Sequence, residues 1–290
     1  MQMTTGEYIH GRVGQQQSVE YQNPPLYSSS ADDIKSYINR LNLESYPESK
    51  IDNEYIDKLL FGTGIVTMER GLYGARFSTG DEADEAKARM KDLDTRHPNE
   101  RSWAGGGEGI WTPYNLCRNF MQNLDIDESH TFEDWGAGWG RVVLYAGITA
   151  TAKCRGIELV GDRVARVREA IDKLELDNTE FIEAKIQDHD YTQADVIHMY
   201  LPFSQSTFRT VHGMIEDLSN QKPLTIVNRG SNINQEMAQG RLQNLRFVKW
   251  DKHLGACYYE TKDIAFTTES RVKGPIDFDA VDRHNRQFNG

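Results

Sequence analysis

Short apolar runs alternate with amphipathic segments through the second half of the chain, and this pattern predicts strands and helices in turn. Within the amphipathic segments the apolar residues return every three or four positions, which is the spacing of one buried helix face. The predicted strands are residues 131–134, 154–159, 180–184, 195–201 and 224–228, and the predicted helices between them are residues 140–150, 162–174 and 206–218. Strands that alternate with helices favour a parallel sheet with helices on both faces.

The last part of the pattern differs from this alternation. Residues 245–250 and 256–261 are apolar runs with no helical segment between them, so they predict an antiparallel hairpin at the edge of the sheet. The fold class that follows is α/β, with a mostly parallel sheet, a C-terminal antiparallel hairpin and a mainly helical N-terminal extension.

Composition divides the rest of the chain. Residues 1–50 are polar, and we predict an arm that is partly disordered or helical, with one helix at residues 31–43 capped by Ser30. Residues 51–108 are predicted to be a helical extension that ends in a glycine-rich loop, and residues 266–290 a C-terminal tail. Further helices are predicted at residues 51–61 and 81–93, and one that Thr112 caps, with Pro113 at its first position.

An acid and three glycines follow the first predicted strand. They form the pattern Asp134-x-Gly136-x-Gly138-x-Gly140, and an acid, Glu158, ends the second apolar run. Glycines let the backbone approach a ligand closely, and a carboxylate at the end of the next strand can accept hydrogen bonds from ribose hydroxyls. A dinucleotide fingerprint would place its third glycine at position 141, which is an arginine, so the spacing favours another nucleoside cofactor over a nicotinamide one.

This pattern resembles the first motif of class I S-adenosylmethionine-dependent methyltransferases. The resemblance spans residues 109–265, which we predict to be a methyltransferase domain with the family's Rossmann-like sheet. It implies S-adenosyl-L-methionine as the cofactor and no metal. It also implies that Asp134 and the glycine loop hold the amino acid end of the cofactor and that Glu158 binds the ribose. The cofactor-binding residues that it implies are Trp111, Asp134, Gly136, Ala137, Gly138, Gly140, Glu158, Ile186 and Asp188.

The adenine contact departs from the family pattern. The family often has an acid after the third strand, and this chain has Lys185 there, which cannot accept a hydrogen bond. The side chain of Asp188 or the backbone of Ile186 is the remaining candidate for reading the adenine. The departure also leaves open a non-catalytic protein that binds the cofactor, or serves as a scaffold, on the methyltransferase fold.

The end of the fourth predicted strand is where the family carries its substrate motif. The sequence Tyr200-Leu-Pro-Phe203 is not the Asn/Asp-Pro-Pro-Tyr/Phe motif of enzymes that methylate nucleic acid amines. It is similar to small bacterial and non-SET lysine methyltransferase-like proteins. Tyr200 and Phe203 are candidates for flanking a target amine by cation–π contact, with core packing as the alternative for both rings. The expected acceptor is an amine of a protein or of a small molecule.

Composition limits the expected partners and compartment. The formal net charge is −11, so a nucleic acid is repelled overall and is not an expected partner. No apolar run is long enough to span a bilayer, and the N-terminus lacks the apolar core of a secretory signal. The three cysteines are widely spaced and form no metal-binding pair. We therefore expect a cytoplasmic protein without a membrane partner.

Basic residues and histidines near these motifs have structural and functional interpretations. Arg163, Arg166 and Arg168 lie on one predicted helix, where neighbouring acids favour a solvated surface. His198 lies inside the fourth predicted strand, a position that favours a structural role. His189, in a loop near the expected crevice, is the stronger candidate for a base.

Overall fold

The computed structural model describes residues 25–26, 29–43, 45–73, 80–96, 111–200, 203, 205–229, 233–251, 255–262 and 270–273. The predicted glycine-rich loop, and most of the predicted arm and tail, lie outside these residues. The strands are β1 (Thr131–Trp135), β2 (Lys153–Glu158), β3 (Thr179–Glu183), β4 (Val196–Tyr200), β5 (Thr225–Arg229), β6 (Leu245–Asp251) and β7 (Ala256–Thr261).

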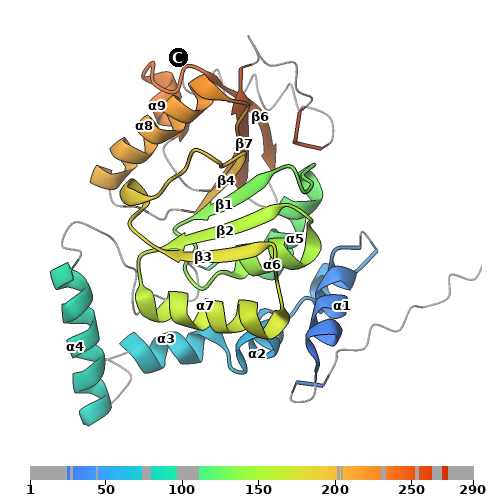
Figure 1. Cartoon of the computed structure of the whole chain (residues 1–290), viewed down its shortest axis with the longest axis vertical. Coiled ribbons are helices and arrows are strands. Elements are labelled where there is room, and N and C mark those ends of the chain that lie inside the picture. The colour runs from blue at the N-terminus through green and yellow to red at the C-terminus, as the bar shows by residue number, and fades with distance from the viewer. Residues whose placement is uncertain are drawn as a thin grey trace, which may run out of the picture.

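The strands form one seven-stranded sheet in the order β3-β2-β1-β4-β5-β7-β6 (Figure 1). Strands β1 to β5 pair with one another in parallel, whereas β7 is antiparallel to both β5 and β6. The predicted α/β class and its antiparallel C-terminal hairpin are therefore confirmed. The chain runs outward from β1 to β3 in one direction and from β4 to β5 in the other, so the strand order reverses between β1 and β4.

Helices cover both faces of the sheet, and further helices form an N-terminal extension. They are α1 (Ala31–Leu41), α2 (Asn53–Phe61), α3 (Ile65–Tyr73), α4 (Asp81–Arg96), α5 (Tyr114–Asn123), α6 (Arg141–Thr149), α7 (Gly161–Leu174), α8 (Gln205–Gln221) and α9 (Ile233–Ala238), with short 3₁₀ turns η1 (Glu48–Lys50) and η3 (Ile186–Asp188). None of the helices in the described ranges combines the length and apolar character that crossing a bilayer requires.

The first helix forms where the spacing of apolar residues predicts it. Ser30 and Asp33 make a capping box, and the side chain of Ser30 accepts a hydrogen bond from the Asp33 N–H at 3.2 Å. The apolar face of α1 is buried in the same cluster as the helices on one face of the sheet. Helices α1 and α2 lie against the outside of α6 and α7 (Figure 1). The N-terminal helices therefore share a core with the sheet, while the proposed domain boundaries stay predictions.

Helix α5 begins later than the sequence predicts. Thr112 is not its cap; Pro113 is the N-cap, with extended backbone (φ −66°, ψ 152°) and no side-chain hydrogen bond to the helix. Instead Asn53, the first residue of α2, accepts a hydrogen bond from the Tyr114 N–H at 2.8 Å. A residue from the N-terminal extension thus satisfies a backbone donor at the start of α5.

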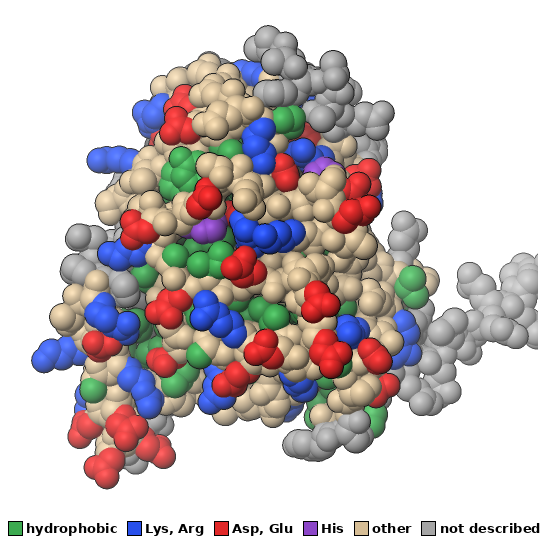
Figure 2. Space-filling view, in the orientation of Figure 1, with side chains coloured by type: hydrophobic (Ala, Val, Ile, Leu, Met, Phe, Trp, Pro, Cys, Tyr) green, Lys and Arg blue, Asp and Glu red, His purple; other side chains and the backbone are tan. Residues whose placement is uncertain are grey.

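Helix α4 extends away from the body of the molecule at the lower left of Figure 1. Its first turn carries Asp81, Glu82 and Asp84, and acidic side chains gather there in Figure 2. Elsewhere on the face in Figure 2, acidic and basic side chains are interspersed. Only Ala83, Ala86 and Leu93 of this helix are buried.

The close packing of β2 against β3 gives a first testable prediction. A Cβ atom at Gly156 would lie 2.2 Å from Cε2 of Phe181, its partner on β3. We expect Gly156→Ala to lower the free energy of unfolding by about 1–3 kcal/mol, because the core must shift to admit the methyl group. Urea denaturation followed by circular dichroism measures this.

The matched control is Gly213→Ala, on α8. A Cβ atom there has no heavy atom within 4 Å, so alanine should raise stability by up to about 1 kcal/mol through its higher helix propensity. Equal effects of the two substitutions would contradict the packing argument.

Candidate functional site

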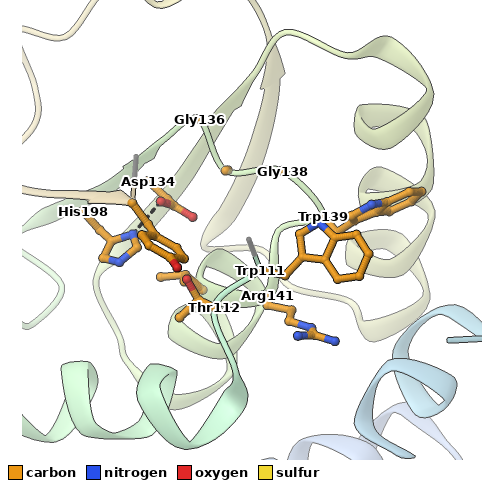
Figure 3. A pocket seen from close by; sticks show the side chains of 11 residues that line it. Trp111, Thr112, Asp134, Gly136, Gly138, Trp139, Arg141 and His198 are labelled. Carbon is orange, nitrogen blue, oxygen red and sulfur yellow. Dashed lines mark hydrogen bonds and ion pairs between the residues drawn. The ribbon is translucent and has the colours of Figure 1, made fainter. Parts of the chain in front are cut away.

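A cavity opens at the carboxyl ends of β1 and β4, where the strand order reverses. In open α/β sheets this is the position at which ligands bind. The cavity and the open solvent at its mouth together make up about 390 Å³ of empty space. Its lining residues are Trp111, Thr112, Asp134, Gly136, Ala137, Gly138, Trp139, Arg141, Val142, His198 and Tyr200 (Figure 3).

The structure brings together part of the set predicted from the sequence. The predicted residues that line the cavity are Trp111, Asp134, Gly136, Ala137, Gly138 and Tyr200. The predicted residues that do not line it are Gly140, Glu158, Ile186, Asp188 and Phe203. The residues that sequence reasoning missed are Thr112, Trp139, Arg141, Val142 and His198. Of these, His198 had a signal in the sequence, since it lies two positions before Tyr200 on one strand and therefore on the same face.

The glycine loop joins β1 to α6 and forms the floor of the cavity. Gly136, Gly138 and Gly140 have positive φ values of 78°, 56° and 70°, a region that other residues enter only with strain. A Cβ atom at Gly138 would meet nothing within 4 Å, whereas one at Gly140 would lie 2.8 Å from Cγ1 of Val167. Gly138 therefore borders open space, and Gly140 allows α6 to pack against α7.

Glu158, at the end of β2, is turned toward this loop. Its carboxylate accepts hydrogen bonds from the Gly138 N–H at 2.7 Å and from the Val160 N–H at 2.9 Å. Each carboxylate oxygen has a second lone pair. A ribose hydroxyl can therefore bind Glu158 beside the Gly138 N–H or in place of it.

Arg163 connects Glu158 to the N-terminal extension. Its Nη1 lies 3.6 Å from Oε1 of Glu158, and its Nη2 lies 2.7 Å from Oε1 of Glu69 on α3. Glu69 also accepts a hydrogen bond from Nε1 of Trp139, in the glycine loop, at 2.8 Å. All of these side chains are buried. Glu69 thus binds two residues at the predicted cofactor site: Arg163, which contacts Glu158, and Trp139, which belongs to the glycine loop.

The expectation that the three arginines of α7 form a solvated surface is wrong for Arg163. Only 4% of its side chain is exposed. Arg168 is exposed and donates from Nε to the Phe181 carbonyl at 2.8 Å, and Arg166 forms an exposed pair with Glu169 at 2.9 Å. The buried carboxylates of two separate elements, which local sequence does not show, explain the burial of Arg163.

A second buried ion pair joins α2 to the start of α6. Nε of Arg141 donates to Oδ1 of Asp57 at 3.0 Å, and the Tyr114 hydroxyl donates to the same oxygen at 3.0 Å. Burial raises the pKa of the Asp57 carboxyl, and the hydrogen bond from Arg141 opposes that rise. Tyr114 itself is completely buried.

Asp134 and His198 are direct neighbours in register on β1 and β4. Oδ1 of Asp134 lies 2.7 Å from Nδ1 of His198, the contact drawn dashed in Figure 3. His198 is buried, and the centroid of its ring lies 4.9 Å from that of the Phe120 ring. His189, the histidine that the sequence favoured, has its Nε2 3.2 Å from Oε2 of Glu133 and does not line the cavity.

The two aromatic candidates at the end of β4 separate in the structure. Tyr200 is half-buried at the cavity, with Cζ of Arg229 lying 4.3 Å from its ring centroid. Phe203 is 9% exposed and packs edge-on against Phe208 at 5.7 Å, in the cluster on the other face of the sheet. The packing alternative therefore describes Phe203 better, and a contact with substrate remains a prediction for Tyr200.

The two adenine candidates lie in the turn η3, outside the cavity lining. Ile186 is buried in the same cluster as Trp135, and Asp188 is exposed, with its N–H bound to the Lys185 carbonyl at 3.0 Å. Their contact with an adenine ring stays a prediction.

No protein-family model matches the chain, and no curated protein matches it. Solved structures similar to the chain include methyltransferases. An RNA methyltransferase from Salinibacter ruber, in complex with S-adenosyl-L-homocysteine, is 24% identical over 56% of this chain and 99% of its own, with a TM-score of 0.41. Precorrin-6y C5,15-methyltransferase from Geobacter metallireducens is 14% identical over 53% and 90%, with a TM-score of 0.39. A SAM-dependent methyltransferase from Aquifex aeolicus is 16% identical over 60% and 97%, with a TM-score of 0.37.

Proposed function

We propose that this chain is an S-adenosylmethionine-dependent methyltransferase whose cofactor binds in the cavity between β1 and β4. The observation that carries the proposal is the glycine loop, with three positive-φ glycines beside a cavity at the strand-order reversal. The open space at Gly138 suits a ligand that lies directly on the backbone. Glu158, at the end of the adjacent strand, has the carboxylate that a ribose requires.

Each part of the cavity has a proposed role toward the cofactor. The glycine loop and the unpaired N–H groups that begin every helix, here those of α6, suit the carboxylate of a methionine. Trp111 and Trp139 pack together with Ile65 and form an apolar side of the site. When bound, the sulfonium supplies an electrophilic methyl group. The protein then has to align a nucleophile with it and exclude water.

The acceptor that we propose is an amine of a protein or small molecule. The ring of Tyr200 at the cavity already has one cation, Arg229, against it, which supports an aromatic site for cationic nitrogen. The reported similar structures do not carry the name of a lysine methyltransferase, so that narrower resemblance is not confirmed. One of them is named for RNA, so the exclusion of nucleic acid drawn from net charge is not supported, and RNA belongs in the acceptor screen.

Cofactor binding tests the proposal directly. We expect isothermal titration calorimetry to show binding of S-adenosylmethionine and S-adenosylhomocysteine, and no binding of NADH. Gly138→Arg should weaken the binding of S-adenosylhomocysteine at least 100-fold, about 2.7 kcal/mol, because the arginine side chain fills the space next to the loop. Absence of cofactor binding to the wild-type protein would overturn the proposal.

Gly80→Arg is the matched control for Gly138→Arg. Gly80 has a similar φ of 61° and no heavy atom within 4 Å of a Cβ, but lies directly before α4, away from the cavity. The control variant should bind the cofactor as the wild type does. Binding without transfer of a radiolabelled methyl group to any protein, RNA or small molecule of a lysate would favour the scaffold alternative.

A further inference from the structure

Nε2 of His198 is a buried polar atom of the cavity that has no hydrogen-bond partner among the residues the structure describes. The side chain is 2% exposed, so bulk water does not reach it freely. A buried polar group left without a partner costs about 1–3 kcal/mol. A ligand that supplies the missing partner recovers this free energy on binding.

The contact with Asp134 determines what kind of partner Nε2 needs. Oδ1 of Asp134 lies 2.7 Å from Nδ1. An ionised carboxylate only accepts hydrogen bonds, so the imidazole hydrogen lies on Nδ1. Nε2 of the neutral ring then has a lone pair and requires a donor. Figure 3 shows the imidazole beside Asp134 at the cavity.

The charges around the ring favour a cationic donor. The titratable groups around the ring and its partner Asp134 on β1 are Arg141 on α6, Tyr200 on β4 and the Cys117 thiol on α5. Burial raises the pKa of Cys117, so this thiol is neutral at physiological pH. Arg141 is bound to the carboxylate of Asp57. Asp134 therefore gives the pair a negative charge that a cation can offset.

We propose that Nε2 of His198 is the hydrogen-bond acceptor for an ammonium group in the cavity, with Asp134 orienting the ring and supplying the counter-charge. The inference rests on the proposed function and refines it. The sequence motif assigned the amino acid end of the cofactor to Asp134 and the glycine loop, and in the structure Oδ1 of Asp134 is bound to His198. Two ammonium groups have the required chemistry: the α-ammonium of the cofactor's methionine and the amine of an acceptor at the methyl position.

His198→Asn tests the assignment without an identified acceptor. The asparagine amide can still donate to Asp134, but it has no atom at the position of Nε2. The probes are S-adenosylhomocysteine and sinefungin, a cofactor analogue with an amine at the methyl position, both titrated by calorimetry at pH 8. We expect the variant to lose about 10- to 100-fold in affinity, the range for a hydrogen bond to a charged group.

The two probes distinguish the two ammonium groups. If His198 binds the α-ammonium, the substitution lowers the affinity for both probes equally, because both carry that group. If His198 faces the acceptor, it lowers the affinity for sinefungin and leaves the affinity for S-adenosylhomocysteine unchanged. Unchanged affinity for both probes would overturn this inference and leave the proposed function standing, whereas failure of the wild type to bind S-adenosylhomocysteine would remove both.

The control substitution is His130→Asn. His130 makes the same kind of contact, Nδ1 to Oδ1 of Asp127 at 2.8 Å, but lies outside the cavity, and its loss should leave both affinities unchanged. Should His198→Asn not fold, nitrogen-15 spectra of the wild type give the answer. The Nε2 resonance should have the shift of an unprotonated nitrogen and move when S-adenosylhomocysteine or sinefungin is added. A protonated Nε2, or one insensitive to both ligands, would overturn the inference.

Discussion

Glu69→Ala should lower the free energy of unfolding by about 3–5 kcal/mol, the range for removing one partner of a buried ion pair. The substitution takes away the carboxylate that lies 2.7 Å from Nη2 of Arg163 and that accepts the indole N–H of Trp139. Both the guanidinium and the indole are buried, so water cannot readily replace it. Urea denaturation monitored by circular dichroism measures the loss.

A surface pair supplies the control for this effect. Glu85 and Arg89 on α4 lie 3.6 Å apart and are both exposed, so Glu85→Ala should change stability by less than about 0.5 kcal/mol. We also expect Glu69→Ala to weaken the binding of S-adenosylhomocysteine. Glu69 binds Arg163, which contacts Glu158, and Trp139, which lies in the glycine loop. A loss of stability below about 1 kcal/mol would show that solvent or another side chain compensates Arg163.

Asp57→Ala should lower the free energy of unfolding by a similar amount, about 3–5 kcal/mol. Asp57 accepts hydrogen bonds from both Arg141 and Tyr114, and removing it leaves a buried guanidinium at the start of α6. A positive charge there is also unfavourable because the N-terminus of a helix carries partial positive charge. Thermal or chemical unfolding detects the change.

The double variant Asp57→Leu with Arg141→Met separates burial from pairing. Replacing both charges by apolar side chains should recover most of the lost stability, as is common for buried pairs. Glu54→Ala, on the same helix, removes the exposed partner of Lys58 and should have little effect. A double variant as unstable as Asp57→Ala would show that the loss comes from packing and not from the unpaired charge.

Those elements that local patterns specify could be predicted from the sequence. The strands β1 to β7 and the helices α6, α7 and α8 were expected at nearly their observed positions, because a spacing of two or 3.6 residues depends only on neighbours in the chain. Helices α3 and α9 were not predicted individually, and the six residues of α9 show too few repeats of that spacing. The start of α5 was misplaced because its backbone donor bonds to Asn53, far away in the sequence.

The candidate site follows the same division. The glycine loop and Tyr200 were found because their motifs are contiguous in the sequence. The roles of His198 and Arg163 were not predicted, because each depends on a partner that only the fold brings close. The partner of His198 is Asp134, its neighbour in the β1–β4 register, and the partner of Arg163 is Glu69 on α3. Long-range pairing of this kind leaves no local periodicity in a single sequence.

The position of β7 between β5 and β6 affects how the nascent chain can fold on the ribosome. Strand β6 is synthesised first, but among the described strands its neighbour is β7 alone, which follows it. The edge of β5 and the whole of β6 therefore cannot pair until the last residue of β7, Thr261, has left the exit tunnel. A translation product that stops before Ala256 would leave one edge of β5 and the whole of β6 unpaired, which favours intermolecular aggregation.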